Sequence, residues 1–299
     1  MNLFSSTTPA FLLLGLLIFS FGCQEESKPE MSAAEHARRV AKDDSTTIRI
    51  SPEQLRKNLK TNEMATFLVS GNDVVEANLF RSGIRSVDAL KGVPLRGLDL
   101  GFTYVTDLSP LADMKLETLV LENVPITDIS VIKGMPLKVL KLQNTKVTDF
   151  SMLTGLPLEQ LNLLNLPFSD LTLLRDMPLQ ILWLTGTQVA DLNGIPSRRL
   201  VSLDVERTAV SSVEPLATVS TLRRLNIAGT QVTDVTPLEN LRLERLVLSP
   251  ERIRAGMDNL RKCKSLVLIQ TSIEEEMSAE DFWKRYDLGV WKPADTTSP

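Results

Sequence analysis

Residues that carry chemistry are scarce in this chain of 299 amino acids. It contains one histidine and two cysteines, and Phe, Trp and Tyr together make up 5% of it. So few histidines and cysteines leave little material for a zinc site, a Ser-His or Cys-His catalytic pair, or a disulfide framework. We therefore expect a protein that is not an enzyme, with no catalytic residue, no metal site and no cofactor.

An excess of basic charge is also missing. The 33 Lys and Arg residues are outnumbered by 37 Asp and Glu residues, which gives a formal net charge of -4. Nucleic-acid-binding domains carry a clustered positive surplus. The composition thus argues against nucleic acid as a partner.

Leucine is abundant instead, with 50 residues, and much of it recurs at a fixed period. Pairs of apolar residues separated by one residue return every 21 positions, with one step of 22, and a degenerate first copy starts near Ala77. A period of this length is typical of leucine-rich repeats, which bury their leucines only by stacking on neighbouring copies. The pairs begin at Leu98, Leu119, Leu140, Leu161, Leu182, Leu203, Leu225 and Leu246.

Each copy predicts a short strand followed by a turn. Alternation at period 2 puts the paired leucines on one face of the strand and the residues between them on the other. A Thr-Asp pair such as Thr106-Asp107 marks the turn, and Ser109-Pro110 is interpreted as a capping hydroxyl before a helix-starting proline. About four residues remain before the next Met-Pro, which is room for a 3₁₀ turn and not for an α-helix.

The Thr-x-Val-Thr-Asp-Leu-Ser-Pro-Leu segments resemble the short repeats of bacterial surface leucine-rich-repeat proteins, including the internalins. This resemblance implies an α/β-type right-handed superhelix with a concave parallel β-sheet of about nine strands. The convex side would consist of 3₁₀ turns and loops, and helical caps would close both ends. Many such repeats carry asparagine where this chain has threonine, so we expect a less tightly held turn at Thr103, Thr145, Thr187, Thr208 and Thr230.

Caps are expected on both sides of the repeats, since a terminal coil would otherwise expose its leucines. A strand over residues 48–50 and a helix starting at Ser51-Pro52 predict the first cap. A helix starting at Ser249-Pro250, with Ile253, Met257 and Leu260 on one face, opens the second. A short strand with Leu266 and Leu268 and a helix capped by Ser278 follow, and this closing stretch resembles the ends of repeat proteins of planctomycete-type bacteria.

The amino terminus indicates where the protein is located. Residues 10–22 are apolar except for Ser20, and Cys23 follows directly. This run is shorter than the roughly 20 residues of a membrane-spanning helix but suits a signal peptide. The Gly22-Cys23 junction resembles the cleavage site of bacterial lipoproteins, which implies that Cys23 carries a lipid and anchors the protein to a membrane of the cell envelope. An ordinary secretory signal, with a secreted or periplasmic product, and an uncleaved anchor stay open as alternatives.

These observations divide the chain into six parts. They are a signal peptide (1–22), a flexible charged tether (23–45), an N-terminal cap (46–76), eight or nine leucine-rich repeats (77–250), a C-terminal cap (251–292) and a tail (293–299).

The side chains between the leucines supply a candidate binding face. We expect an apolar anchor at Trp183, Ile181 and Leu164, because aromatic side chains dominate interface energetics. Polar and charged neighbours would surround the anchor: Asn162, Lys141, Gln143, Glu122, Asp204, Glu206 and Arg207.

The favoured interpretation is a non-catalytic, monomeric protein-protein interaction module on the cell envelope, which binds an unidentified partner protein on the concave face. The alternative is a carbohydrate or cell-wall binding protein that uses the same face, with Trp183 as a stacking platform.

Overall fold

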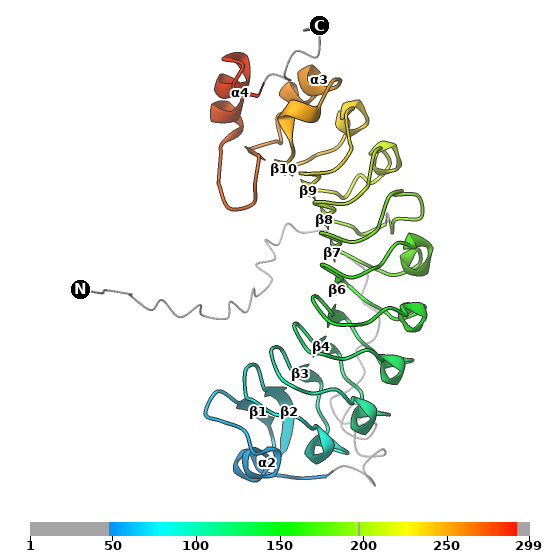
Figure 1. Ribbon diagram of the computed structural model, residues 1–299, viewed down its shortest axis with the longest axis vertical. Coiled ribbons are helices and arrows are strands. Elements are labelled where there is room, and N and C mark those ends of the chain that lie inside the picture. The colour runs from blue at the N-terminus through cyan, green and yellow to red at the C-terminus, as the bar shows by residue number, and fades with distance from the viewer. Residues whose placement is uncertain (1–47, 197, 292–299) are drawn as a thin grey trace, which may run out of the picture. The chain divides into compact units, whose positions relative to one another are not determined.

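A single curved β-sheet organises the part of the chain that the structure describes. The structure is a computed structural model, and it describes residues 48–196 and 198–291, which belong to one compact unit. Eleven strands follow one another in chain order, with β1 (Thr66–Ser70) antiparallel to β2 (Asp73–Asn78) and all later neighbours parallel. In Figure 1 the strands line the inner side of an arc and the connecting turns lie on its outer side. The predicted signal peptide, Cys23, the tether and the tail lie outside the described residues.

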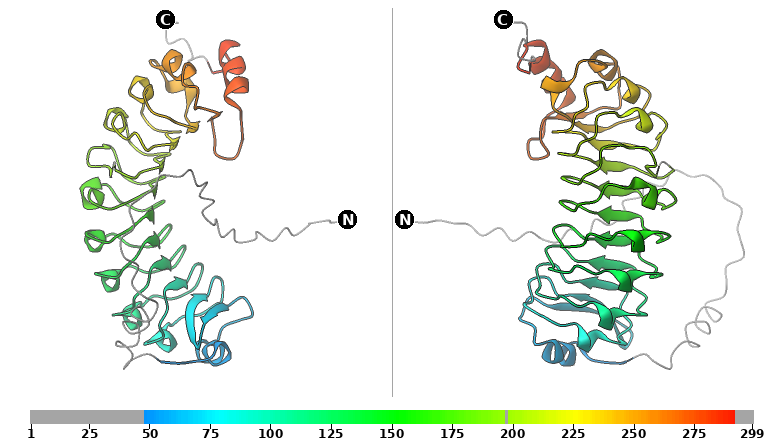
Figure 2. Two further views of the ribbon diagram at one scale, coloured as in Figure 1. Left: turned by 180° about the vertical axis from the view of Figure 1, so that it is seen from behind. Right: turned by 45° about the vertical axis from the view of Figure 1, so that its right-hand side comes forward.

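The nine repeat strands are in the register that the leucine period predicts. Leu98 pairs with Leu119, Leu119 with Leu140, and the same step continues to Leu225 and Leu246. Strands β2 to β10 therefore confirm the prediction of about nine strands, while β1 and β11 are added by the caps (Figure 2). The remaining strands are β3 (Gly97–Asp99), β4 (Thr118–Val120), β5 (Val139–Lys141), β6 (Gln160–Asn162), β7 (Ile181–Trp183), β8 (Ser202–Asp204), β9 (Arg224–Asn226), β10 (Arg245–Val247) and β11 (Leu268–Gln270).

The outer side of the arc consists of short 3₁₀ turns, as predicted. Each turn has only three or four residues. After η1, η3, η4 and η5 a proline (Pro94, Pro136, Pro157 and Pro178) disfavours the helical conformation of the residue before it, which helps to return the backbone to an extended conformation. The segment between β7 and β8 has no 3₁₀ turn among its described residues. The turns are η1 (Asp88–Leu90), η2 (Ser109–Leu111), η3 (Ser130–Ile132), η4 (Ser151–Leu153), η5 (Leu171–Leu174), η6 (Glu214–Leu216), η7 (Thr236–Leu238) and η8 (Pro250–Arg252).

An aspartate holds the start of most of these turns, which corrects the capping role predicted for the hydroxyl of Ser109, whereas in η1 and η6 the hydroxyls of Ser86 and Ser212 accept the equivalent backbone bond. In η2 the backbone N–H of Ser109 donates to Asp107 Oδ1 at 2.8 Å, and the Ser109 hydroxyl donates to Asp107 Oδ2 at 2.9 Å. The serine is the first residue of the turn and caps no backbone group. The same backbone bond recurs two residues after Asp128, Asp149, Asp170, Asp191 and Asp234.

These hydrogen bonds make the fold sensitive to acid. They lower the pKa of five aspartates, through the backbone N–H first at Asp107 and Asp191 and through the hydroxyl first at Asp149, Asp170 and Asp234. A carboxyl whose pKa is lower in the folded than in the unfolded state stabilises the fold above its unfolded pKa, and this contribution is lost as the pH falls through the folded pKa.

We expect the melting temperature to fall with increasing steepness below about pH 4. Thermal melts between pH 7 and pH 2.5 would measure this in the wild type and in a variant with all five aspartates changed to asparagine. Asparagine keeps an oxygen that accepts the backbone bond but has no charge to lose. The melting temperature of the variant should therefore fall less steeply at low pH. Parallel curves for the two proteins would contradict the assignment.

The interior of each coil is apolar and tightly sealed. Leu161, Leu163 and Phe168 of one coil, for example, are at most 1% exposed. Together with the other buried apolar residues they form one continuous core along the stack. Stacking of neighbouring coils therefore buries what one coil could not, as the repeat pattern requires.

The threonines close their own coils and do not tie one coil to the next. The hydroxyls of Thr103, Thr187, Thr208 and Thr230 donate to the carbonyl three residues earlier at 2.6 to 2.7 Å. An amide contact between coils occurs one residue earlier in the repeat, where Asn165 Nδ2 donates to Asn144 Oδ1 at 2.8 Å. Both asparagines have positive φ, a conformation that asparagine tolerates better than most residues.

The N-terminal cap consists of a helix and a hairpin. Helix α2 (Pro52–Leu59) begins as predicted, with the Ser51 hydroxyl accepting from the Gln54 N–H at 3.2 Å. Residues 48–50 are extended but form no strand, so that prediction is wrong. The hairpin β1–β2 supplies the edge of the sheet in its place, and Ile48 bonds to the Gly92 carbonyl of the first turn.

The C-terminal cap differs from the prediction at its first helix. Only η8 follows Ser249; Ile253 is extended, and helix α3 begins at Met257 and ends at Arg261. The chain is extended here because Ala255 pairs with Asp234 of the last repeat. Helix α4 (Ala279–Asp287) begins as predicted, with Ser278 accepting from the Asp281 N–H.

No helix in the described part of the chain is both long and apolar enough to cross a membrane.

Candidate functional site

The inner face of the sheet carries the side chains that the sequence pattern places between the leucines. Ile181 and Trp183 lie two residues apart on β7 and point to this face, whereas Leu182 between them is fully buried. In register with Trp183 stand Asn162 on β6 and Asp204 on β8. The predicted frame of alternation is therefore the observed one.

The predicted anchor lies at the middle of this face. Trp183, Ile181 and Leu164 are each half-buried, so they present part of their apolar surface to solvent. Leu164 follows β6 directly, and its backbone N–H donates to Asn162 Oδ1 at 3.0 Å. Lys141 is half-buried and adjoins Asn162 in the ladder.

The predicted polar ring around the anchor divides into open and buried members. Glu122 and Glu206 are half-buried and Arg207 is exposed, with an ion pair of 3.1 Å between Glu206 and Arg207. Gln143 and Asp204, by contrast, are each only 8% exposed. The structure therefore places these last two within the framework of the face rather than on its surface.

Asp204 is the centre of a hydrogen-bonded network that fixes the face from β7 to β9. The Thr185 hydroxyl donates to Asp204 Oδ1 at 2.6 Å, and the Glu206 N–H donates to the same oxygen at 2.9 Å. Asn226 Nδ2 donates to Asp204 Oδ2 at 2.9 Å and to Glu206 Oε2 at 3.0 Å. Both oxygens of the buried carboxylate are thus satisfied, which burial of a charge requires.

At the opposite end of the face Asp99 has a different environment. Burial raises the pKa of Asp99, against the lowering effects of the Gly101 N–H bond and of the charge on Lys141. Gly101 donates its N–H to Asp99 Oδ1 at 2.8 Å.

The loop between β11 and α4 lies over the face at strands β9 and β10. Figures 1 and 2 show it reaching from the C-terminal cap back over the inner side of the sheet. Arg245 on β10 donates to the Ile273 carbonyl of this loop at 3.3 Å. The residues between the leucines are accordingly buried here, with Asn226 at 5% and Val247 at 2% exposure.

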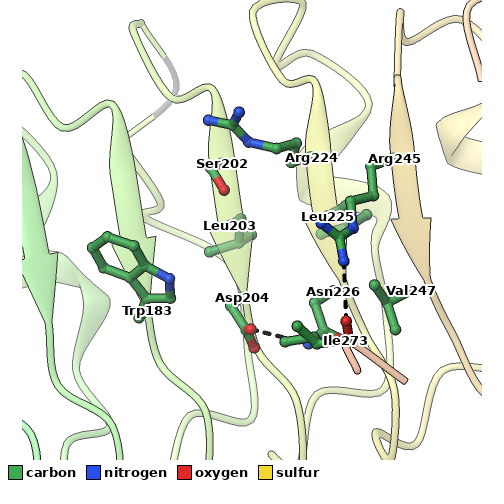
Figure 3. Close-up of a pocket in the computed structure, with 10 residues that line it drawn as sticks. All are labelled: Trp183, Ser202, Leu203, Asp204, Arg224, Leu225, Asn226, Arg245, Val247 and Ile273. Atoms are coloured by element: carbon green, nitrogen blue, oxygen red, sulfur yellow. Dashed lines mark hydrogen bonds between the residues drawn. The ribbon is translucent and has the colours of Figure 1, made fainter. Parts of the chain in front are cut away.

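A hollow of about 170 Å³ remains between this loop and the anchor. Trp183 bounds it at one end and Ile273 at the other, with Arg224 and Arg245 along one side (Figure 3). We call it the Arg224–Arg245 hollow. The full lining is Trp183, Ser202, Leu203, Asp204, Arg224, Leu225, Asn226, Arg245, Val247 and Ile273.

Sequence reasoning found one end of this hollow and missed the other. Trp183 and Asp204 were among the predicted site residues. Arg224 and Arg245 directly precede the first leucine of their strands and take the same position in neighbouring repeats. The repeat pattern could therefore have identified them as neighbours on the concave face. Nothing in the repeat pattern points to Ile273, because the contact joins two segments that are 28 residues apart and share no period.

The described residues hold no group of three or more His, Cys, Asp or Glu side chains that could bind a metal ion. Cys263 is a half-buried free thiol in the C-terminal cap, and its sulfur lies 3.5 Å from the Leu241 carbonyl oxygen.

The stacked 21-residue coils, the parallel inner sheet and the 3₁₀ turns define a leucine-rich-repeat solenoid. Solved bacterial proteins share this fold. The structure is similar to internalin InlF of Listeria monocytogenes, with 26% sequence identity and a TM-score of 0.59 over 73% of this chain and 66% of that one. It is also similar to internalin C2 of the same organism, with 25% identity and a TM-score of 0.51 over 65% of this chain and 90% of that one.

This chain thus matches just under two thirds of the InlF chain. No family model matches the sequence, and no curated protein matches it. The fold and its neighbours support a leucine-rich-repeat protein of the bacterial, internalin-like type.

Proposed function

We propose that this protein is a non-catalytic, monomeric interaction module of the cell envelope, which binds a protein partner on the concave face of its repeats. The observation that carries the proposal is the half-exposed apolar group of Trp183, Ile181 and Leu164 at the centre of a rigid sheet. A preformed surface loses little conformational entropy on binding, and a large aromatic side chain supplies much of the affinity at interfaces.

Attachment to the envelope forms the second part of the proposal. The apolar run of residues 10–22 ending at Gly22-Cys23 supports a lipid on Cys23, with residues 24–45 as a tether between the membrane and the repeats. The intact mass of the mature protein, isolated from membranes, tests this. We expect a chain that begins at Cys23 and carries the added mass of a lipid, whereas an unmodified chain in the soluble fraction would overturn the anchor.

Changing Trp183 to alanine should weaken partner binding by roughly 2 kcal/mol, about 30-fold, since the indole is the largest apolar contact of the face. The measurement is retention of envelope-extract proteins on the immobilised wild type and on the variant. Tyr104→Ala provides the matched control, because Tyr104 is 56% exposed, stacks under Arg85 and lies outside the concave columns.

The carbohydrate alternative predicts a different result in the same experiment. Treating the extract with protease should abolish a protein ligand and leave a glycan ligand intact. Binding that depends on Trp183 but survives protease would overturn the proposed protein partner in favour of a glycan. Equal retention by Trp183→Ala and wild type would overturn the concave anchor itself.

A further inference from the structure

We propose that the Arg224–Arg245 hollow binds an acidic side chain of a partner protein, with an apolar neighbour of that side chain resting on Trp183. This inference rests on the proposed function and deepens it, because it gives the chemistry that the partner must present. Three properties of the hollow support it: the charges along one side, the apolar residues in its lining, and the loop segment that borders it.

The charges come from two arginines in register. Arg224 and Arg245 are partners in the register of the neighbouring strands β9 and β10, and neighbouring strands are about 4.8 Å apart. Like charges directly opposite each other on a sheet destabilise it. The next residues of the same column are Ser202 on β8 and Leu268 on β11, so the column itself supplies no counter-charge.

No acidic residue in the described part of the chain forms an ion pair with Arg224 or Arg245, although Glu274, Glu275 and Glu276 follow Ile273 in the loop, where Glu275 pairs with Arg285 at 3.4 Å. Both oxygens of Asp204 are occupied by Thr185, Glu206 N–H and Asn226. Arg224 is exposed and has no ion-pair partner within the described ranges, 48–196 and 198–291. Its guanidinium is therefore free to bind an external carboxylate, for which the planar fork of arginine is well matched.

The ends of the hollow are apolar. Trp183 and Ile273 bound it on opposite sides, and Leu225 and Val247 contribute to the lining (Figure 3). A volume of about 170 Å³ holds several water molecules and thus accommodates one side chain. A carboxylate would bind the arginines, and an aliphatic or aromatic group next to it would pack against the apolar residues of the lining.

The chain's own loop indicates why the occupant is a peptide. Ile273 places an aliphatic side chain at the hollow, and its backbone carbonyl accepts from Arg245 Nη2 at 3.3 Å. The border of the hollow therefore already combines an aliphatic side chain with a peptide carbonyl that an arginine binds, the two elements that a partner segment offers. A glycan would bring ring hydroxyls against the apolar half of the lining, which consists of Trp183, Leu203, Leu225, Val247 and Ile273.

Fluorescein-labelled hexapeptides provide the probe. One set carries two central glutamates flanked by Leu or Phe; the matched sets carry glutamine or lysine in place of glutamate. We expect fluorescence anisotropy with the full mature chain to show binding of the glutamate set, about tenfold weaker binding of the glutamine set, and no binding of the lysine set. Equal binding of the glutamate and glutamine sets would overturn the proposal.

Variants locate the binding. Arg224→Gln should weaken binding of the glutamate peptides at least about tenfold. It should not lower the melting temperature, because the Arg224 side chain makes no bond that stabilises the fold and its loss removes the repulsion with Arg245. Arg242→Gln is the matched control: it makes the same charge change on an exposed residue of the same coil, outside the hollow. An equal loss from Arg242→Gln would reveal unspecific attraction and overturn the site.

Charge reversal gives the sharpest contrast. In the double variant Arg224→Glu, Arg245→Glu the preference should move from the glutamate set to the lysine set. If oligogalacturonate binds in an Arg224-dependent manner while no glutamate peptide does, the site takes an anionic glycan and the proposed peptide is wrong.

The outcome can be separated from that of the proposed function. Should the glutamate peptides fail to bind while Trp183→Ala still abolishes retention of envelope protein, only the inference about the hollow fails. Should the peptides bind through Arg224 while Trp183→Ala leaves that retention unchanged, the hollow stands and the central anchor fails.

Discussion

The Leu161→Asp variant should lose at least about 4 kcal/mol of unfolding free energy, because the change removes core packing and buries an unpaired carboxylate. Leu161 lies on β6 in the middle of the stack and is fully buried. Its neighbours in the ladder, Leu140 and Leu182, are also fully buried, so no water can reach an aspartate placed between them. Urea unfolding followed by circular dichroism would measure the loss.

The next residue provides the control. Asn162 lies on the opposite face of β6, is half-buried, and accepts the Leu164 N–H through its side-chain oxygen. Aspartate keeps that acceptor, so Asn162→Asp should change the stability by less than about 0.5 kcal/mol. Comparable losses for the two variants would mean that the alternation of the strands is displaced by one residue.

Gly256→Ala is expected to cost roughly 3 kcal/mol or more, because it combines a steric overlap with a left-handed backbone. Gly256 has a φ of +92°, and a Cβ there would overlap the Thr236 nitrogen and lie 2.6 Å from the Val235 carbonyl carbon. Thr236 and Val235 belong to the last repeat, so the C-terminal cap would have to move away from it. Compared with the wild type, the variant should show faster hydrogen exchange in residues 255–291 and unchanged exchange in β3 to β7.

Gly134→Ala separates the two contributions. Gly134 has a φ of +75°, but nothing lies within 4 Å of the position of its Cβ. It should therefore show only the backbone cost of about 1–2 kcal/mol, with no local change in exchange at the cap. A Gly256→Ala effect no larger than that of Gly134→Ala would show that the cap is not held against Thr236.

The repeat frame could be predicted because it is local. In each coil Leu-x-Leu alternation fixes which side chains face inward, and the 21-residue step fixes which leucine lies beside which. The single step of 22 residues between Leu203 and Leu225 left the pairing intact, since both are in register in the structure. Ser51 and Ser278 were likewise identifiable as helix caps from their immediate neighbours.

The caps were harder to predict where the chain pairs with another coil. The sequence from Ser249 to Leu260 has helical spacing, yet Arg254 and Ala255 donate their N–H groups to the Thr233 carbonyl and remain extended. Tertiary pairing overrode local propensity here. The hairpin β1–β2 was missed for a similar reason, because its strands gain stability as the edge of a sheet that the local pattern does not reveal.

The candidate site shows the same division. Trp183, Ile181 and Leu164 could be assigned to the concave face from the alternation of a single strand and its neighbours. Whether a position on that face is open depends on what lies above it. Val247 has the same place in its coil as Asn162, but it is 2% exposed because the loop carrying Ile273 covers it.

By itself the sequence determined the solenoid, its register and the residues that face inward, since neighbours in a repeat are always one period apart. Only the tertiary structure decided that a loop of the C-terminal cap folds back over β9 and β10, that Asp204 is buried in a network, and that Arg224 and Arg245 border a hollow. Contacts between the cap and the sheet join segments with no periodic relation, so their energies appear only once the whole chain is folded.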